Sequence, residues 1–154
     1  MKNIVTYINE SVNNVSGYRR AKEIFEPLVK KALENEGYTV KTGDQNEDFN
    51  HVDLIVSGKE NNFTVDVKAN DEKQKNSKNF TFTIVSNGGK EYPFDKNNFF
   101  AFVDEITNKI YLVNQEDFYK RFGHYSKRNG LKDNSKWILV SKADVAKLGR
   151  VISY

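Results

Sequence analysis

Two aspartates inside apolar, strand-like stretches constrain this chain more than any other feature of its sequence. Asp53 and Asp66 each lie among aliphatic and aromatic residues, and a turn-prone stretch separates the two segments. This pattern predicts a β-hairpin with strands at 51–57 and 62–69. A charged side chain within an apolar strand is costly unless it is paired or binds a metal, so the pattern indicates a site on the hairpin.

The spacing of Asp66 and Lys68 determines which side of the sheet they share. Side chains alternate between faces along a strand, so these two point to one side and Val67 to the other. A hairpin register can bring Asp53 beside Asp66, and two carboxylates suit Mg²⁺ or Mn²⁺, which prefer oxygen ligands. Lys68 would then lie near a developing negative charge. The alternatives are a solvent-exposed Asp–Lys strand face and a structural salt-bridge cluster.

Composition limits the class of protein. The chain has 154 residues, of which 29% are charged and 38% hydrophobic, which predicts one globular domain over 1–154. No apolar run approaches the roughly twenty residues of a membrane-spanning helix, so no membrane partner is expected. Cysteine is absent, which excludes disulfides and thiolate zinc sites and favours a cytoplasmic location.

Positive charge gathers in the C-terminal segment. Residues 120–150 carry nine Lys/Arg and two acids, for a net +7, whereas the rest of the chain carries −4. A basic segment beside an acidic remainder predicts a surface for a polyanion such as nucleic acid, and a solvated lysine-rich surface is the alternative. Arg19 and Arg20 are weaker candidates for phosphate contacts. The candidate nucleic-acid-binding residues are Lys73, Lys75, Lys78, Arg121, Tyr125, Lys127, Arg128 and Lys132.

Hydrophobic periodicity predicts a mixed α/β fold around one sheet. Pro27 should kink the second helix or begin its second half, and Gly37 should end it. The expected helices are 3–15, 18–36, 115–122 and 142–148, the last capped by Ser141. The expected strands are 38–42, 51–57, 62–69, 80–85, 98–104, 109–114 and 137–140, with a polar segment at 70–79 and a basic loop at 123–135.

These residues together resemble the PD-(D/E)XK nuclease superfamily, and within it the small Holliday-junction-resolvase-like nucleases. The resemblance covers about 17–70 and rests on Glu26, eleven residues before Gly37, on Asp53, and on Asp66-Val67-Lys68. It implies a restriction-endonuclease-like fold, a mixed sheet flanked by helices. The chain departs from the pattern in having Val52 where the superfamily name has proline, aspartate at Asp66 instead of the more frequent glutamate, and Pro27 directly after Glu26.

The resemblance implies a Mg²⁺- or Mn²⁺-dependent endonuclease. Asp53, Asp66 and the Val67 carbonyl would be metal ligands, Glu26 would bind directly or through water, and Lys68 would be the catalytic lysine. Glu23 is a weaker alternative to Glu26. DNA is favoured over RNA as substrate, and a homodimer would suit the cutting of both strands of a duplex. The alternative is a catalytically inactive relative that binds nucleic acid or a protein.

Overall fold

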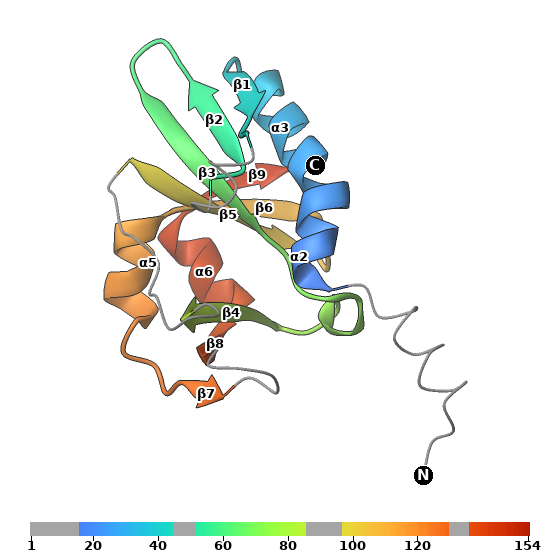
Figure 1. Cartoon of the computed structure of the whole chain (residues 1–154), viewed down its shortest axis with the longest axis vertical. Helices are drawn as coiled ribbons and strands as arrows, with labels where there is room; N and C mark the ends of the chain where they lie inside the picture. Colours follow the sequence, from blue (N-terminus) through green and yellow to red (C-terminus); the bar gives the residue numbers. More distant parts are fainter. Residues whose placement is uncertain (1–15, 45–51, 86–96, 130–135) are drawn as a thin grey trace, which may run out of the picture.

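Two β-sheets and the helices that pack on them make up the structure (Figure 1). The computed structural model describes residues 16–44, 52–85, 97–129 and 136–154. The helical elements are α2 (Gly17–Arg20), η1 (Ala21–Phe25), α3 (Glu26–Asn35), η2 (Glu72–Gln74), α5 (Gln115–Phe122) and α6 (Lys142–Leu148). The strands are β1 (Thr39–Thr42), β2 (Leu54–Ser57), β3 (Asn62–Lys68), β4 (Asn79–Val85), β5 (Asn98–Asp104), β6 (Lys109–Asn114), β7 (Arg128–Asn129), β8 (Lys136–Ser141) and β9 (Arg150–Ser153).

The mixed α/β class is confirmed, but the prediction of a single sheet is wrong. One sheet has the order β1-β2-β3-β5-β6-β9, with β3 and β5 parallel, and a second has the order β4-β8-β7. Alternating apolar residues indicate that β4 is a strand but do not say which strand it pairs with. The apolar side of β4 packs face to face against β5 and β6 instead of extending their sheet.

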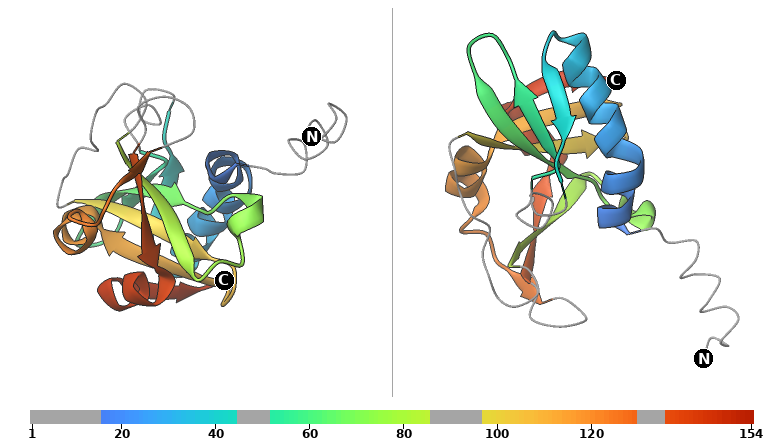
Figure 2. Two further views of the ribbon diagram at one scale, coloured as in Figure 1. Left: turned by 90° about the horizontal axis from the view of Figure 1, so that it is seen from below. Right: turned by 45° about the horizontal axis from the view of Figure 1, so that its top comes forward.

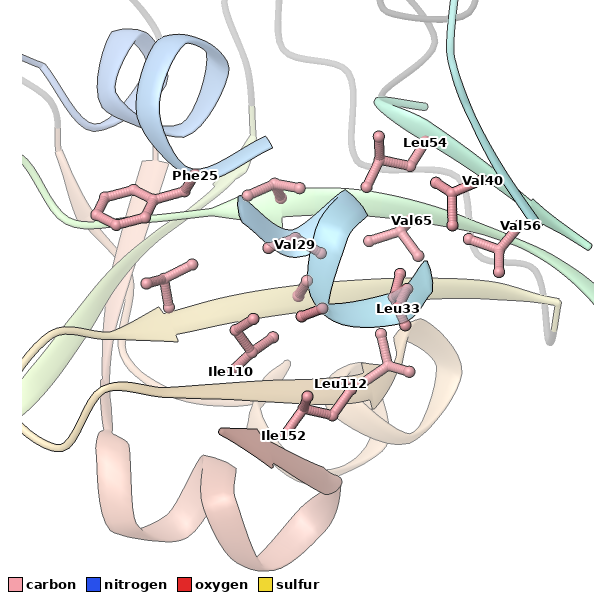
Figure 3. Close-up of a cluster of buried hydrophobic side chains, with 14 of the residues drawn as sticks. Phe25, Val29, Leu33, Val40, Leu54, Val56, Val65, Ile110, Leu112 and Ile152 are labelled. Carbon is pink, nitrogen blue, oxygen red and sulfur yellow. The ribbon is translucent and has the colours of Figure 1, made fainter. Parts of the chain in front are cut away.

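The N-terminal helical segment covers one face of the six-stranded sheet. Val29 and Leu33 of α3 lie among Leu54 and Val65 of the β2–β3 hairpin, and all four side chains are buried (Figure 3). Burying such a side chain contributes about 1.5–3 kcal/mol, so this cluster fixes α3 against the hairpin.

The second sheet, α5 and α6 cover the opposite face, as Figure 2 shows from two further directions. Phenylalanines dominate this layer: Phe82 of β4, Phe100 and Phe102 of β5, and Phe118 of α5 have ring centroids 4.7–6.0 Å apart in successive pairs. The aromatic layer therefore holds the two sheets together.

The predicted helix 18–36 is one continuous segment with a π-helical turn in its middle. The Glu26 N–H donates to the Ala21 carbonyl, five residues back, and Pro27 then occupies the first turn of α3. Proline is tolerated in a first turn because its missing N–H has no partner to lose there. The helix ends before Gly37, whose φ of +99° suits glycine, so both expectations for these residues are confirmed.

The remaining expectations have mixed outcomes. Strands 98–104 and 109–114 and helices 115–122 and 142–148 are confirmed with the predicted bounds. The strand expected at 51–57 begins only at Leu54, the basic loop contains β7, and β9 was missed because four residues give too short a pattern. Helix 3–15 and Lys132 lie outside the described residues. Among the described helices, none is long and apolar enough to cross a membrane.

Candidate nuclease site

A local irregularity where β2 begins sets the position of Asp53. The Asp53 N–H donates to the Val65 carbonyl at 2.9 Å, yet Val65 is already the register partner of Leu54. Two successive residues opposite one partner form a β-bulge, which re-aims side chains next to functional sites. The Asp53 carbonyl also accepts from the Gly43 N–H at 2.8 Å, so its backbone is held from both sides.

The Asp53 carboxylate lies against the backbone of the neighbouring strand. Its Oδ2 accepts a hydrogen bond from the Val67 N–H at 2.7 Å. Within a strand the N–H and carbonyl of one residue point to the same side, so the Val67 carbonyl also faces the Asp53 side of β3. The structure therefore brings two of the predicted ligands, the Asp53 carboxylate and the Val67 carbonyl, to one edge of β3.

Asp66 and Lys68 share the other face of β3, as their spacing predicts. Lys68 Nζ lies 3.1 Å from Asp66 Oδ2, and the Asp66 side chain is 6% exposed while that of Lys68 is 24% exposed. Asp66 Oδ2 accepts no hydrogen bond of good geometry within the described part of the chain, so the contact with Lys68 is an ion pair alone. A buried carboxylate oxygen held only by an ion pair is suited to exchange that partner for a ligand.

Aromatic rings position the ammonium group of Lys68. Its Nζ lies 5.6 Å from the centroid of the Phe82 ring and 5.9 Å from that of Phe100. A cation within about 6 Å of a ring face is attracted by the ring quadrupole, and the attraction strengthens when the cation is partly desolvated. Phe82 of the second sheet and Phe100 of β5 thus hold Lys68 beside Asp66, a contribution that sequence analysis missed because both rings lie far from Lys68 in the sequence.

Glu26 occupies the first turn of α3 and is 5% exposed. Its Oε2 lies 3.7 Å from Lys22 Nζ, one turn earlier. Residues three and seven positions apart share a helix face, so Glu26 lies on the same face as Val29 and Leu33, which pack with Val65 and Val67. Asp66 and Lys68 point to the opposite face of β3, so α3 approaches the hairpin from the other side. Glu23, the weaker candidate, is exposed and paired with Arg19, which places it on the outer surface.

The donors of the hairpin fit a small, hard divalent cation. Within the described residues no three Asp, Glu, His or Cys side chains are close enough to hold a metal together. Magnesium does not need such a cage, because it keeps several waters and binds through one or two carboxylates plus substrate phosphate. The Asp53 and Asp66 carboxylates and the Val67 carbonyl supply oxygen donors only, as that chemistry requires.

The predicted nucleic-acid-binding residues form two separate groups. Lys73 and Lys78 are exposed near the start of β4, where Lys75 pairs with Glu72 at 2.9 Å. The other group lies towards the opposite end of the second sheet, where β7 pairs with β8. There Arg121 donates to the Tyr125 hydroxyl at 3.1 Å, and Lys127 and Arg128 are exposed.

A buried polar cluster near the end of β3 was not predicted. We call it the Arg20 cluster: Arg20, Asn70, Glu72 and Glu105. Arg20 is 3% exposed and contacts Glu105 at 2.5 Å, Glu72 at 3.1 Å and the Asn70 carbonyl at 2.8 Å. Burial lowers the pKa of Arg20, but Glu105 and Glu72 raise it more, so its net pKa lies above the ordinary value. The weaker expectation that Arg20 contacts phosphate is not supported, because its side chain is buried.

A second unpredicted group, the Asp104 cluster, contains Asp104, Thr107, Tyr111 and Lys142. Asp104 accepts from the Tyr111 hydroxyl at 2.6 Å and the Thr107 hydroxyl at 2.8 Å, with Lys142 Nζ at 3.7 Å. Burial raises the pKa of Asp104, but these hydrogen bonds outweigh it and leave the pKa below its ordinary value. Burial also lowers the pKa of Lys142, against the attraction of Asp104. No local pattern distinguishes these residues from surface charges.

Comparison with known proteins adds no relative: the chain matches no protein-family model, no curated protein and no solved structure.

Proposed function

We propose that this chain is a metal-dependent phosphodiester hydrolase acting on nucleic acid, an endonuclease of PD-(D/E)XK type with a restriction-endonuclease-like fold. The observation that carries the proposal is the arrangement on β3. The Asp53 carboxylate accepts a hydrogen bond from the Val67 N–H. The residues before and after Val67, Asp66 and Lys68, form an ion pair in which the Asp66 carboxylate is buried. Acids and a lysine on adjacent strands are the groups that phosphodiester hydrolysis requires.

Each residue has a distinct role in the proposed site. Asp53, Asp66 and the Val67 carbonyl would hold Mg²⁺ or Mn²⁺, and Glu26, on the helix that covers the other face of β3, would take part only through water. Bound there, the cation would polarise a phosphate oxygen and lower the pKa of a water. The Asp53 carboxylate is already oriented by the Val67 N–H, so little side-chain ordering remains to be done on binding.

Lys68 would stabilise the charge that builds up on the phosphate. In the hydrolysis a water oxygen forms a bond to phosphorus while the bond to the leaving sugar oxygen breaks. The water loses a proton and the leaving oxygen gains one. The ammonium group of Lys68 lies between a carboxylate and two rings, so it can turn from Asp66 to a phosphate oxygen without entering bulk water.

The exposed cations would bind the substrate. Lys73, Lys78, Lys127 and Arg128 would neutralise backbone phosphates, with DNA favoured over RNA. Homodimerisation would allow both strands of a duplex to be cut. A cytoplasmic location, predicted from the cysteine-free composition, belongs to the same proposal.

A second candidate function is binding without cleavage. In the described residues Asp66 already has a cation 3.1 Å away, and the acids do not form a group of three. A protein that reuses this arrangement to bind nucleic acid or a protein would need neither the metal nor the lysine. It predicts no cleavage under any metal condition.

A cleavage screen separates the two functions. Purified protein is incubated with Mg²⁺ or Mn²⁺ and duplex, single-stranded, junction and RNA substrates. Asp66→Asn and Lys68→Ala are expected to lower the cleavage rate by about 100- to 1,000-fold, because each removes charge stabilisation in the transition state. Lys31→Ala, an exposed lysine on α3, is the matched control and should cut like the wild type.

Nucleic-acid binding is measured alongside by anisotropy in EDTA. Retained binding in Asp66→Asn with lost cleavage supports the nuclease. An Asp66→Asn protein that cuts as fast as the wild type contradicts the site, and binding without cleavage by the wild type favours the second function.

A further inference from the structure

The outer face of the second sheet carries the only tryptophan of the chain, on the middle strand β8. Phe80, Phe82 and Ile84 of β4 point inward to the aromatic layer, so the alternate residues Thr81 and Thr83 point outward and are exposed. Trp137 pairs with Thr83 on one side and with Arg128 on the other. Arg128, Trp137 and Thr83 therefore form a row across all three strands.

The chemistry of this row suits a planar, anionic ligand. Trp137 is partly exposed, and the Arg128 guanidinium carbon lies 5.4 Å from its ring centroid. Lys127 is exposed one residue before Arg128, and Lys136 is partly exposed one residue before Trp137. Arg128 is the cation recorded beside the indole, and within the described part of the β7–β8 hairpin and Lys127 no acid is present. Lys136 directly precedes Trp137 in β8, so its side chain points to the opposite face of the strand. Bases stack on aromatic faces while Lys and Arg neutralise their phosphates.

We infer that the outer face of the β4-β8-β7 sheet is a stacking platform for single-stranded nucleic acid, with Trp137 as the base-stacking residue and Arg128 and the exposed Lys127 as phosphate contacts. A duplex keeps its bases stacked inside, so it cannot offer a base plane to Trp137 without being opened. The inference rests on the proposed function in that it names single-stranded nucleic acid as the substrate class of the proposed nuclease.

The position of β4 connects this platform to the hairpin site. Phe82 lies between Thr81 and Thr83 in the sequence but points to the opposite face, where its ring lies 5.6 Å from Lys68 Nζ. β4 is also an edge strand of its sheet in the described structure. A single-stranded nucleic acid whose base stacks on Trp137 would thus need to pass around β4 alone to bring a phosphate to Lys68.

The single tryptophan makes the test direct, because all indole fluorescence comes from the proposed site. The wild-type protein in EDTA is titrated with an oligothymidylate of about 12 nucleotides and with a duplex of equal length. Stacking predicts quenching by the single strand and little change with the duplex. Equal quenching by both, or none by either, would overturn the inference.

Variants test the same point by anisotropy of a labelled oligonucleotide. Trp137→Leu should weaken single-strand binding by about tenfold, since base stacking on an aromatic is worth about 1–3 kcal/mol per base. Trp137→Phe, which keeps a ring, should stay within about threefold by the same reasoning. Tyr18→Leu removes an aromatic that is 72% exposed on α2 and is the matched control, expected to bind normally. Normal binding by Trp137→Leu overturns the inference.

Two further readouts distinguish the platform from a dimer interface and from the nuclease site. Fluorescence that changes with protein concentration alone would show that a second copy occupies the face, which also overturns the inference. Cleavage with Mg²⁺ without any change in Trp137 fluorescence would overturn the platform inference and support the proposed nuclease. Quenching of Trp137 fluorescence by the single strand without any cleavage would contradict the hydrolase proposal and support the platform. Circular dichroism confirms that each variant is folded, and the wild-type titration needs no variant.

Discussion

The hairpin site and the Arg20 cluster are both buried ion-pair groups, but they differ in how many partners hold the buried charge. Among the described residues, Arg20 Nε and Asp66 Oδ2 alike make no hydrogen bond of good geometry and have an ion pair alone. Arg20 contacts two carboxylates and a backbone carbonyl at 2.5–3.1 Å. In the hairpin site, Asp66 Oδ2 has Lys68 at 3.1 Å and, among the described residues, accepts no hydrogen bond of good geometry. A buried charge thus has several partners in the Arg20 cluster and one ion-pair partner in the hairpin site.

This difference separates a charge with several partners from a charge with one. Removing one partner of a buried charge lowers the free energy of unfolding strongly, so a charge with several partners fixes the segments that carry them. The Arg20 cluster ties α2 to the end of β3 and to Glu105 after β5, which positions the strand that carries Asp66 and Lys68. A buried carboxylate with one ion-pair partner costs stability and leaves a group that a ligand can stabilise.

The largest expected effect on stability comes from Arg20. Arg20→Met leaves Glu105 partly buried without its closest cation and should lower the free energy of unfolding by about 3–5 kcal/mol. Asp66→Asn should change the free energy of unfolding by no more than about 1 kcal/mol, because it removes a buried charge without changing volume and the Lys68 ammonium that loses its partner is 24% exposed. Urea denaturation of the two variants measures both. Equal losses in the two variants would remove the distinction between the clusters.

Asn70 should give the next largest effect. Its side-chain amide donates to the Gln74 and Asn79 carbonyls at 3.1 and 2.9 Å, and its oxygen accepts from the Thr81 N–H at 3.0 Å. Asn70→Ala leaves these partly buried backbone groups without their partner and should cost about 2–3 kcal/mol of unfolding free energy. The control is Asn76→Ala, an exposed asparagine in the same connection, which should change stability by less than about 0.5 kcal/mol. A neutral Asn70→Ala would show that the connection from β3 to β4 is held elsewhere.

The Asp104 cluster predicts a loss of stability in acid. The folded state lowers the pKa of Asp104 below its ordinary value of 3.8, so its contribution is present above about pH 4 and is lost as pH falls through and below 3.8. Asp104→Asn should make the loss of unfolding free energy in acid smaller by about 1 kcal/mol. Unfolding free energy measured from pH 6 to pH 2.5 tests this. An unchanged slope in the variant argues against the cluster as its source.

The smallest effect on stability is expected for an exposed cation. Lys75 pairs with Glu72 on the surface, so Lys75→Ala should change the unfolding free energy by less than about 0.5 kcal/mol. If Lys75 contacts a phosphate, the slope of log binding constant against log salt concentration should become shallower by about one. Lys30→Ala, whose lysine pairs with Glu34 on α3, is the control and should leave the slope unchanged. A larger stability loss would make Lys75 part of the Arg20 cluster.

Local patterns determined much of this protein from sequence alone. Helices 115–122 and 142–148 have the predicted bounds because Asn114 and Ser141 cap them with bonds to backbone N–H groups three residues on. The shared face of Asp66 and Lys68 follows from the alternation of a strand, and the hairpin follows from its turn residues. Each of these properties depends on residues within a few positions of one another.

Tertiary structure decided the rest. The pairing of β4 with β8, the burial of Arg20 against Glu105 and the aromatic contacts of Lys68 each join segments many residues apart. The bulge that turns Asp53 towards Val67 depends on how two strands pair, not on either strand alone. Sequence alone predicted a candidate site and the residues in it, but packing between distant segments determined which of the buried charges have several partners and which have one.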